Sequence, residues 1–164
     1  GKIVTVRQLL NHTSGIKDYT ESDILNKLQE VGYSTENFLE LLEQREFDFE
    51  PGDARDYNNS GFVLLALIIE KLSGLSYEEY LNKNIFQPVG MPNTSNCYTE
   101  SIKSKIVEGY NLNKEGELNP AKLDDLEMSR GAGTVCSTVE DLLKWLNALH
   151  RTNKLLDEKG YNAK

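Results

Sequence analysis

Three short groups of residues have types and spacing that could do chemistry. They lie at positions 14–17 (Ser-Gly-Ile-Lys), 57–59 (Tyr-Asn-Asn) and 131–133 (Gly-Ala-Gly). Ser14 and Lys17 have the Ser-x-x-Lys spacing that places a lysine amine beside the nucleophile of serine acylases. That match contains a glycine and follows a predicted helix instead of opening one, so we interpret it as coincidental. The glycine group lacks the third glycine and the Gly-Lys-Ser/Thr sequence of phosphate loops, which favours a tight backbone turn.

The second group stands directly before an unbroken apolar run from Phe62 to Ile69. Asn58 can act as the N-cap of a helix there, and Tyr57 can then pack on Phe62 as a hydrophobic staple. Polar residues at the start of a buried helix can also take part in catalysis. Spacing alone favours the staple, and it leaves both interpretations open.

Metal and cofactor signals are weak throughout the chain. The two histidines, His12 and His150, are far apart, and no pair of histidines or cysteines has the spacing of metal ligands. We therefore predict no metal and no cofactor, and we expect His12 to hydrogen-bond around a helix end.

Cys97 and Cys136 could pair, but for a domain with its own core we expect two free, buried thiols.

Composition limits the class of protein. The formal net charge is −8 and the pI is about 4.8, which would repel phosphate backbones, so we expect no nucleic-acid partner. No apolar run reaches the roughly 18 residues of a membrane span. With 38% hydrophobic residues in a chain of 164, a real core is feasible. We expect a single domain over residues 1–164, with a frayed tail at 157–164.

Helix signals dominate the rest of the chain. Capping boxes are predicted at Thr5, Ser76 and Ser137, and weaker helices follow Thr20 and Ser34. The apolar run predicts a central helix over 60–73, which Gly74 ends. The last helix carries Leu142, Trp145, Leu146 and Leu149 on one face. An alternating stretch near 107–119 turns at 114–116 and predicts a small β-hairpin, so the fold class is mainly α.

Three longer stretches carry a family resemblance. They are "IVTVRQLLNHTSGIKDY" at 3–19, the segment from Phe49 to Thr94 that contains "YNNSGFVLLALIIEKLSGLSYEEYL", and "GAGTVCSTVEDLLKW" at 131–145. This pattern resembles the serine β-lactamase-like family, which includes class C β-lactamases, D-alanyl-D-alanine carboxypeptidases, D-aminopeptidases and related esterases. The resemblance implies the helical subdomain of an α/β fold whose sheet-forming ends lie outside this chain.

The resemblance also implies roles for two residues. Tyr57 and Asn59 match the family's Tyr-x-Asn motif, so Tyr57 would transfer protons beside the nucleophilic serine and Asn59 would bind the amide carbonyl of a small-molecule or peptide substrate. The family's Ser-x-x-Lys and Lys/His-Thr/Ser-Gly motifs are not matched here. We therefore expect a fragment of a longer serine hydrolase that is inactive alone and can self-associate through exposed apolar surface.

The same residues are compatible with a second kind of protein. The alternative to an enzyme is a non-catalytic scaffold or binding domain derived from the same family. Asn58 is bulkier than the residues usual between Tyr and Asn, and Thr134 stands where a further glycine is common, so the substrate class is open. The resemblance suggests a bacterial cell envelope or secreted location.

Overall fold

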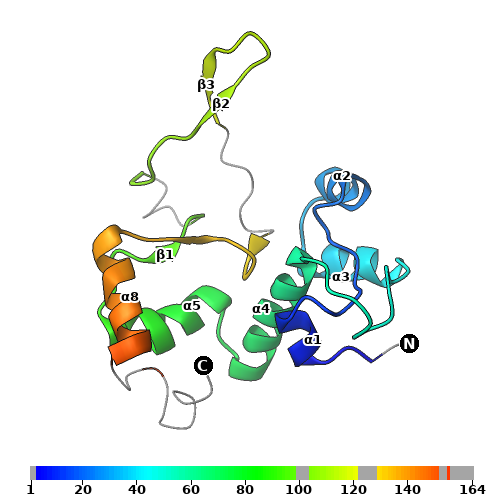
Figure 1. Cartoon of the computed structure of the whole chain (residues 1–164), viewed down its shortest axis with the longest axis horizontal. Helices are drawn as coiled ribbons and strands as arrows, with labels where there is room; N and C mark the ends of the chain where they lie inside the picture. The colour runs from blue at the N-terminus through cyan, green and yellow to red at the C-terminus, as the bar shows by residue number, and fades with distance from the viewer. Residues whose placement is uncertain (1–2, 99–103, 122–128, 152–154, 156–164) are drawn as a thin grey trace. The chain divides into compact units, whose positions relative to one another are not determined.

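The computed structural model describes residues 3–98, 104–121, 129–151 and 155, and helices dominate this part of the chain (Figure 1). The helical elements are α1 (Val6–Leu10), α2 (Ser22–Val31), α3 (Thr35–Glu43), α4 (Asn59–Ser73), α5 (Tyr77–Leu81), the π-helical turn η1 (Asn82–Phe86), α6 (Gln87–Val89) and α8 (Val139–Arg151). The strands are β1 (Ser95–Asn96), β2 (Tyr110–Leu112), β3 (Leu118–Pro120) and β4 (Val135–Cys136). The mainly α fold expected from the sequence is confirmed.

The chain forms two compact units. Unit 1 consists of Gly1–Leu72 with Met128–Gly133, and unit 2 of Ser73–Glu127 with Thr134–Lys164. That both units fold as one domain over 1–164 stays a prediction. The tail at 157–164, which the sequence predicts to be frayed, lies outside the described residues.

Unit 1 is built around the apolar helix α4. Its core consists of side chains from the loop before α2 and from α2, α3 and α4. They are Tyr19, Ile24, Leu28, Phe38 and Val63. The rings of Tyr19 and Phe38 meet edge to face, with centroids 5.9 Å apart. Edge-to-face is one of the two arrangements that aromatic pairs prefer, and the contact holds the loop that carries Tyr19 against α3.

The glycine turn at 131–133 packs against α4. Gly131 has a φ of 79°, and a Cβ atom there would overlap the carbonyl oxygen of Phe62. Only a glycine combines this backbone conformation with such a close approach. The prediction of a tight turn is therefore confirmed, and its cause is packing against α4.

The helix caps follow local sequence, with one correction. The capping boxes at Thr5 and Ser76 are both present, with Gln8 and Glu79 as the reciprocal partners. The box predicted at Ser137 is wrong by one residue, because Thr138 Oγ1 accepts the hydrogen bond from the Asp141 backbone N, at 3.3 Å. The Ser137 hydroxyl is instead engaged across the strand pair β1–β4, where it bonds Thr94 Oγ1 at 2.7 Å.

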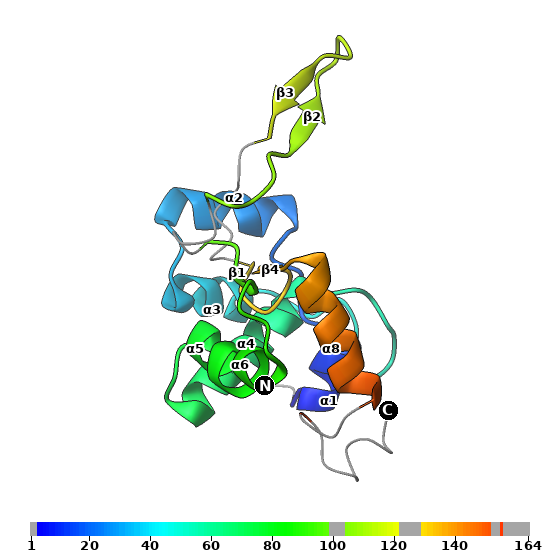
Figure 2. The ribbon, with the colours of Figure 1, turned by 90° about the vertical axis from the view of Figure 1, so that its left-hand side faces the viewer.

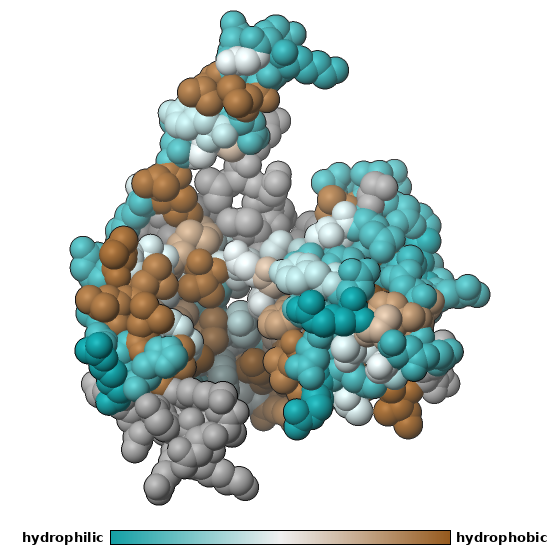
Figure 3. Space-filling model, viewed as in Figure 1, coloured by the Kyte–Doolittle hydropathy of each residue, from teal (hydrophilic) through white to brown (hydrophobic). Residues whose placement is uncertain are grey.

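Unit 2 places α8 against the segment that carries α5, η1 and α6. Its core cluster is Leu81, Phe86, Val89, Met91 and Ala148, with Trp145 packed against it. The face predicted for α8 is only partly buried, because Leu142 and Leu146 are 49% and 52% exposed. Figure 3 shows apolar residues gathered over α8 on the visible face of the molecule.

A buried carboxylate anchors the start of α8. Asp141 is fully buried and accepts hydrogen bonds from Asn93 N (2.7 Å), Thr94 Oγ1 (3.1 Å) and Lys144 Nζ (2.7 Å). Burial acts to raise the pKa of Asp141, but these hydrogen bonds and the Lys144 charge outweigh it, so the pKa lies below its ordinary value. The carboxylate thereby ties α8 to the chain before β1.

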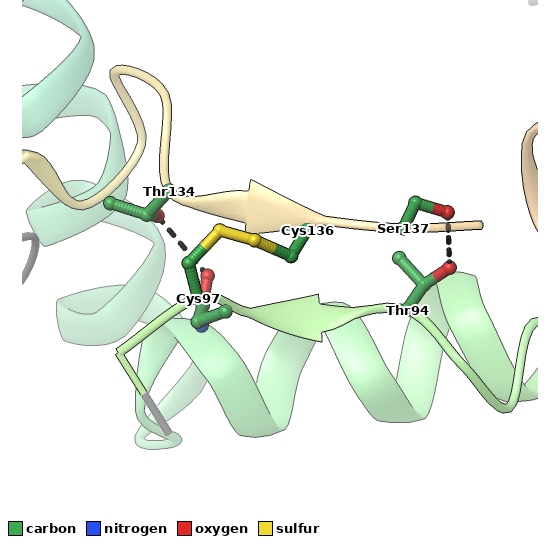
Figure 4. Close-up of a disulfide and its surroundings, with 6 residues drawn as sticks. Thr94, Cys97, Thr134, Cys136 and Ser137 are labelled. Carbon is green, nitrogen blue, oxygen red and sulfur yellow. Dashed lines mark hydrogen bonds between the residues drawn. A yellow bond between two sulfur atoms is a disulfide. The ribbon is translucent and has the colours of Figure 1, made fainter. Parts of the chain in front are cut away.

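Two antiparallel strand pairs complete the described part of unit 2. In the first, Ser95 faces Cys136 and Asn96 faces Val135, and Cys97 and Cys136 form a disulfide with their Cα atoms 5.1 Å apart (Figure 4). The expectation of two free thiols is therefore wrong. Pairing of β1 with β4 brings the two cysteines within the distance that a disulfide needs.

The second pair, β2 with β3, is the hairpin that the sequence predicts (Figure 2). Tyr110 faces Pro120 and Leu112 faces Leu118, and the turn contains Gly116 at a φ of 81°.

Within the described residues, no single helix is both long and apolar enough to cross a membrane. One broken pair of helices, Asn59–Ser73 with Tyr77–Val89, passes the same test of length and composition together.

Candidate functional site

The group at 57–59 lies where α4 begins, and its middle residue caps the helix. Asn58 is buried, and its Oδ1 accepts a hydrogen bond from Gly61 N at 2.7 Å. Its Nδ2 donates to the carbonyl oxygen of Ile16 at 2.6 Å. Asn58 is thus the N-cap that the sequence predicts, and it also ties α4 to the loop that carries Ile16.

Tyr57 precedes the cap and is 63% exposed. Its ring lies against the imidazole of His12, with centroids 4.6 Å apart, and the same imidazole stacks on Phe62 at 5.1 Å. Tyr57 and Phe62 thus both pack on His12, and a direct staple between these two rings stays a prediction. An exposed phenol held from one side can meet a reactant from the other.

His12 also holds the backbone that carries Tyr57. Its Nδ1 accepts the hydrogen bond of Asn58 N at 3.1 Å, and its carbonyl oxygen accepts that of Asp56 N at 3.0 Å. The φ of His12 is 59°, in the left-handed region that non-glycine residues rarely adopt. His12 therefore hydrogen-bonds around a helix end, here the start of α4, as predicted from the sequence.

Asn59, the first residue of α4, is held by Asp18. Its backbone N and its side-chain Nδ2 both donate to Asp18 Oδ2, at 2.6 and 3.0 Å. The other carboxylate oxygen, Oδ1, accepts from the backbone N and the hydroxyl of Thr20, both at 2.8 Å. The segment 12–20 thus positions the Tyr-x-Asn motif. Asp18 and Asn59 are 41 residues apart in sequence.

Four carboxylates lie near residues 57–59. A cavity of about 20 Å³ lies beside Tyr57 and Asn58, and Asp18, Glu21, Asp48 and Asp56 contribute to its lining. That volume holds roughly one water molecule. Within the described residues, no group of three or more His, Cys, Asp or Glu side chains could hold a metal ion.

Ser14 and Lys17 do not form a nucleophile pair in the structure. Ser14 is buried, and its Oγ accepts a hydrogen bond from Ile16 N at 3.4 Å. Lys17 forms ion pairs with Asp48 and, at 3.6 Å, with Glu21. The hydrogen bond with Asp48 is the main reason why the pKa of Lys17 is raised. Both side chains have structural partners, which supports the interpretation that their spacing is coincidental.

The sequence predicts Tyr57 and Asn59 as site residues, and Asp18 is not among the residues predicted from it. A usable signal was present, because an Asp followed by Thr two residues later is typical of an Asx turn, which would have predicted the Thr20 contacts. The contact between Asp18 and Asn59 carries no comparable local signal. It forms only when α4 packs beside the loop before α2.

Comparison with known proteins gives a consistent result. The family model described as "Beta-lactamase" matches residues 1–163. Penicillin-binding protein 4* of Bacillus subtilis (strain 168) is 33% identical over 162 residues, which cover 90% of this chain and 36% of that protein. The chain thus spans about a third of the length of this relative.

Two solved structures are also similar. The octameric penicillin-binding protein homologue from Pyrococcus abyssi is 31% identical with a TM-score of 0.74, and the match covers 97% of this chain and 37% of that one. The D-amino acid amidase from Ochrobactrum anthropi SV3, complexed with D-phenylalanine, is 27% identical with a TM-score of 0.79. That match covers 96% of this chain and 47% of the amidase.

Proposed function

The chain belongs to the beta-lactamase family, and we propose that it forms the helical part of a serine hydrolase. The reaction is acyl transfer from β-lactams, D-amino-acid peptides or esters, through a covalent intermediate on a serine. The similarity to penicillin-binding proteins and to a D-amino acid amidase supports this class of substrate. The substrate is a small molecule or a peptide.

The observation that carries the proposal is the exposed Tyr57 beside a fixed Asn59. The phenol ring lies against His12, which accepts a hydrogen bond from the backbone N of the neighbouring Asn58, while Tyr57 itself stays 63% exposed. In the proposed reaction, the Tyr57 hydroxyl carries a proton to and from the nucleophile. The Asn59 carboxamide binds the substrate carbonyl.

Proton transfer by a phenol requires a nearby cation, because a positive charge stabilises the phenolate. The charged residues that line the cavity beside Tyr57 are carboxylates, which do not stabilise it. We propose that the cation is the lysine of a Ser-x-x-Lys segment in a longer protein that includes this chain. The same segment supplies the nucleophile.

It follows that the 164-residue chain alone does not form an acyl-enzyme. The buried Ser14 and the ion-paired Lys17 support this. The chain should neither hydrolyse a chromogenic cephalosporin nor become labelled by a fluorescent penicillin. Stoichiometric covalent labelling at Ser14 would overturn this part of the proposal.

The test of the function is Tyr57→Phe in the full-length protein. This change keeps the ring contact with His12 and removes the hydroxyl. Since general acid–base groups contribute roughly 10²–10⁴-fold, kcat/KM should fall at least about 100-fold, or about 2.7 kcal/mol, with an unchanged melting temperature. Tyr110→Phe, at a comparably exposed tyrosine of the hairpin, is the matched control and should keep full activity.

Two outcomes would refute the assignment. Full activity of Tyr57→Phe would mean that the hydroxyl has no catalytic role and that the ring serves packing alone. A loss of activity in proportion to the unfolded fraction would mean that the effect is structural. Either result would favour a scaffold or binding domain derived from the family.

We also propose a location outside the cytoplasm. The Cys97–Cys136 disulfide supports this, because disulfides persist in oxidising compartments and are rare in the cytosol. Recovery of the two cysteines as free thiols, from cells lysed under thiol-blocking conditions, would argue against it.

A further inference from the structure

Asp18 has more hydrogen bonds than an ordinary surface carboxylate. Its Oδ1 accepts from the backbone N and the hydroxyl of Thr20, both at 2.8 Å, and its Oδ2 accepts from the backbone N and the Nδ2 of Asn59, at 2.6 and 3.0 Å. A carboxylate offers about four acceptor positions, so these four donors saturate it. Asp18 is therefore clamped locally by Thr20 and holds the first residue of α4 with its other oxygen.

This arrangement decides which way the Asn59 carboxamide faces. An ionised carboxylate only accepts hydrogen bonds, so Asn59 must present its NH₂ group to Asp18. The carbonyl oxygen Oδ1 then points to the other side, and within the described residues no partner for it is found. The second N–H of Nδ2 also stays available. Asn59 consequently offers one acceptor and one donor in fixed directions.

We propose that Asp18 is a positioning residue of the active site, which sets the orientation of the Asn59 carboxamide for catalysis. The inference rests on the proposed function of Asn59. The fixed N–H donates to the substrate's amide carbonyl, and the fixed Oδ1 accepts from an ammonium group of the nucleophile segment. A carboxamide that rotated by 180° would present donors where an acceptor is needed, and substrate and lysine would both be misplaced.

The first test uses the 164-residue chain and does not depend on activity. The side-chain NH₂ signals of Asn59 are followed by ¹⁵N NMR and are assigned by their absence in Asn59→Ala. The Asn59 Nδ2 proton that is hydrogen-bonded to Asp18 should be protected from exchange with solvent. Asp18→Asn should abolish that protection, because a carboxamide at position 18 can turn its own NH₂ group toward Asn59. Thr20→Val removes one hydroxyl contact to Asp18 and should leave the Asn59 signals protected. Unchanged Asn59 protection in Asp18→Asn would overturn the proposal.

The second test is a double-mutant cycle in the full-length hydrolase. Misplacement by about 1 Å can cost about 10²-fold in rate, so Asp18→Asn should lower kcat/KM by about 10- to 100-fold after correction for the folded fraction. In an Asn59→Ala background the same change at Asp18 should have almost no further effect, since Asp18 acts through Asn59. Additive losses would show that Asp18 acts elsewhere or through stability, and would overturn the proposal.

The two tests separate failure of this inference from failure of the proposed function. If Tyr57→Phe and Asn59→Ala both leave the hydrolase fully active, the proposed function fails, and with it any catalytic meaning of Asp18. The NMR test still shows whether Asp18 orients Asn59. If Asn59→Ala impairs catalysis while Asp18→Asn does not, the function stands and the inference about Asp18 is wrong.

Discussion

Removal of the Cys97–Cys136 disulfide should destabilise unit 2 strongly. The two cysteines are 39 residues apart in sequence. Cross-linking a loop of that length removes chain entropy from the unfolded state worth about 4 kcal/mol at 25 °C. Small domains have unfolding free energies of about 5–15 kcal/mol, so this loss is a large fraction of the total. The perturbation is the double variant Cys97→Ser, Cys136→Ser.

Trp145 provides the assay. It is the one tryptophan of the sequence, and it packs against the core cluster of unit 2. Its fluorescence therefore reports unfolding of this unit, whether or not unit 1 unfolds at the same urea concentration. With urea m-values of about 1–3 kcal/mol/M, a loss of about 4 kcal/mol lowers the midpoint by roughly 1.3–4 M.

Two controls distinguish the cross-link from other changes at β1 and β4. Wild-type protein in reductant should unfold like the double variant. Ser137→Ala removes a neighbouring hydroxyl contact to Thr94 and should cost only about 1 kcal/mol. Equal midpoints for oxidised and reduced wild-type protein would refute the reasoning, as would two free thiols in unreduced, denatured protein.

Three further outcomes are expected. Because the pKa of Asp141 is depressed, its stabilisation is present above the ordinary aspartate pKa of about 3.9 and is lost as pH falls through the lower folded-state value. The urea midpoint reported by Trp145 should therefore fall in acid, and Asp141→Asn should flatten that fall. Gly131→Ala should destabilise unit 1 by more than about 1 kcal/mol in thermal melts followed by circular dichroism, since it strains the backbone and overlaps α4. The exposed side chains of Leu142 and Leu146 should bind a hydrophobic dye and promote self-association, and replacing both with glutamine should reduce both signals.

Local sequence predicts the features whose cause is local. The caps at Thr5, Ser34, Ser76 and Asn58 depend on a side chain reaching a backbone N–H three residues ahead. The hairpin follows from alternation around a turn that contains Gly116, and α4 from an apolar run long enough for several helical turns. The Tyr-x-Asn motif is likewise visible without any structure. The shift of the last cap from Ser137 to Thr138 shows the limit of such rules, because a contact across two strands competes for the Ser137 hydroxyl.

Tertiary structure alone decides the contacts between distant segments. Asp18 meets Asn59 across 41 residues, His12 meets Asn58 across 46, and Cys97 meets Cys136 across 39. No local pattern encodes these pairs, because each requires two segments to be brought together by packing of their apolar neighbours. The residue types of the candidate site are therefore predicted from the sequence. The orientation of Asn59, the ring that supports Tyr57 and the oxidation state of the cysteines are properties of the folded chain, since each depends on a distance that only the assembled core sets.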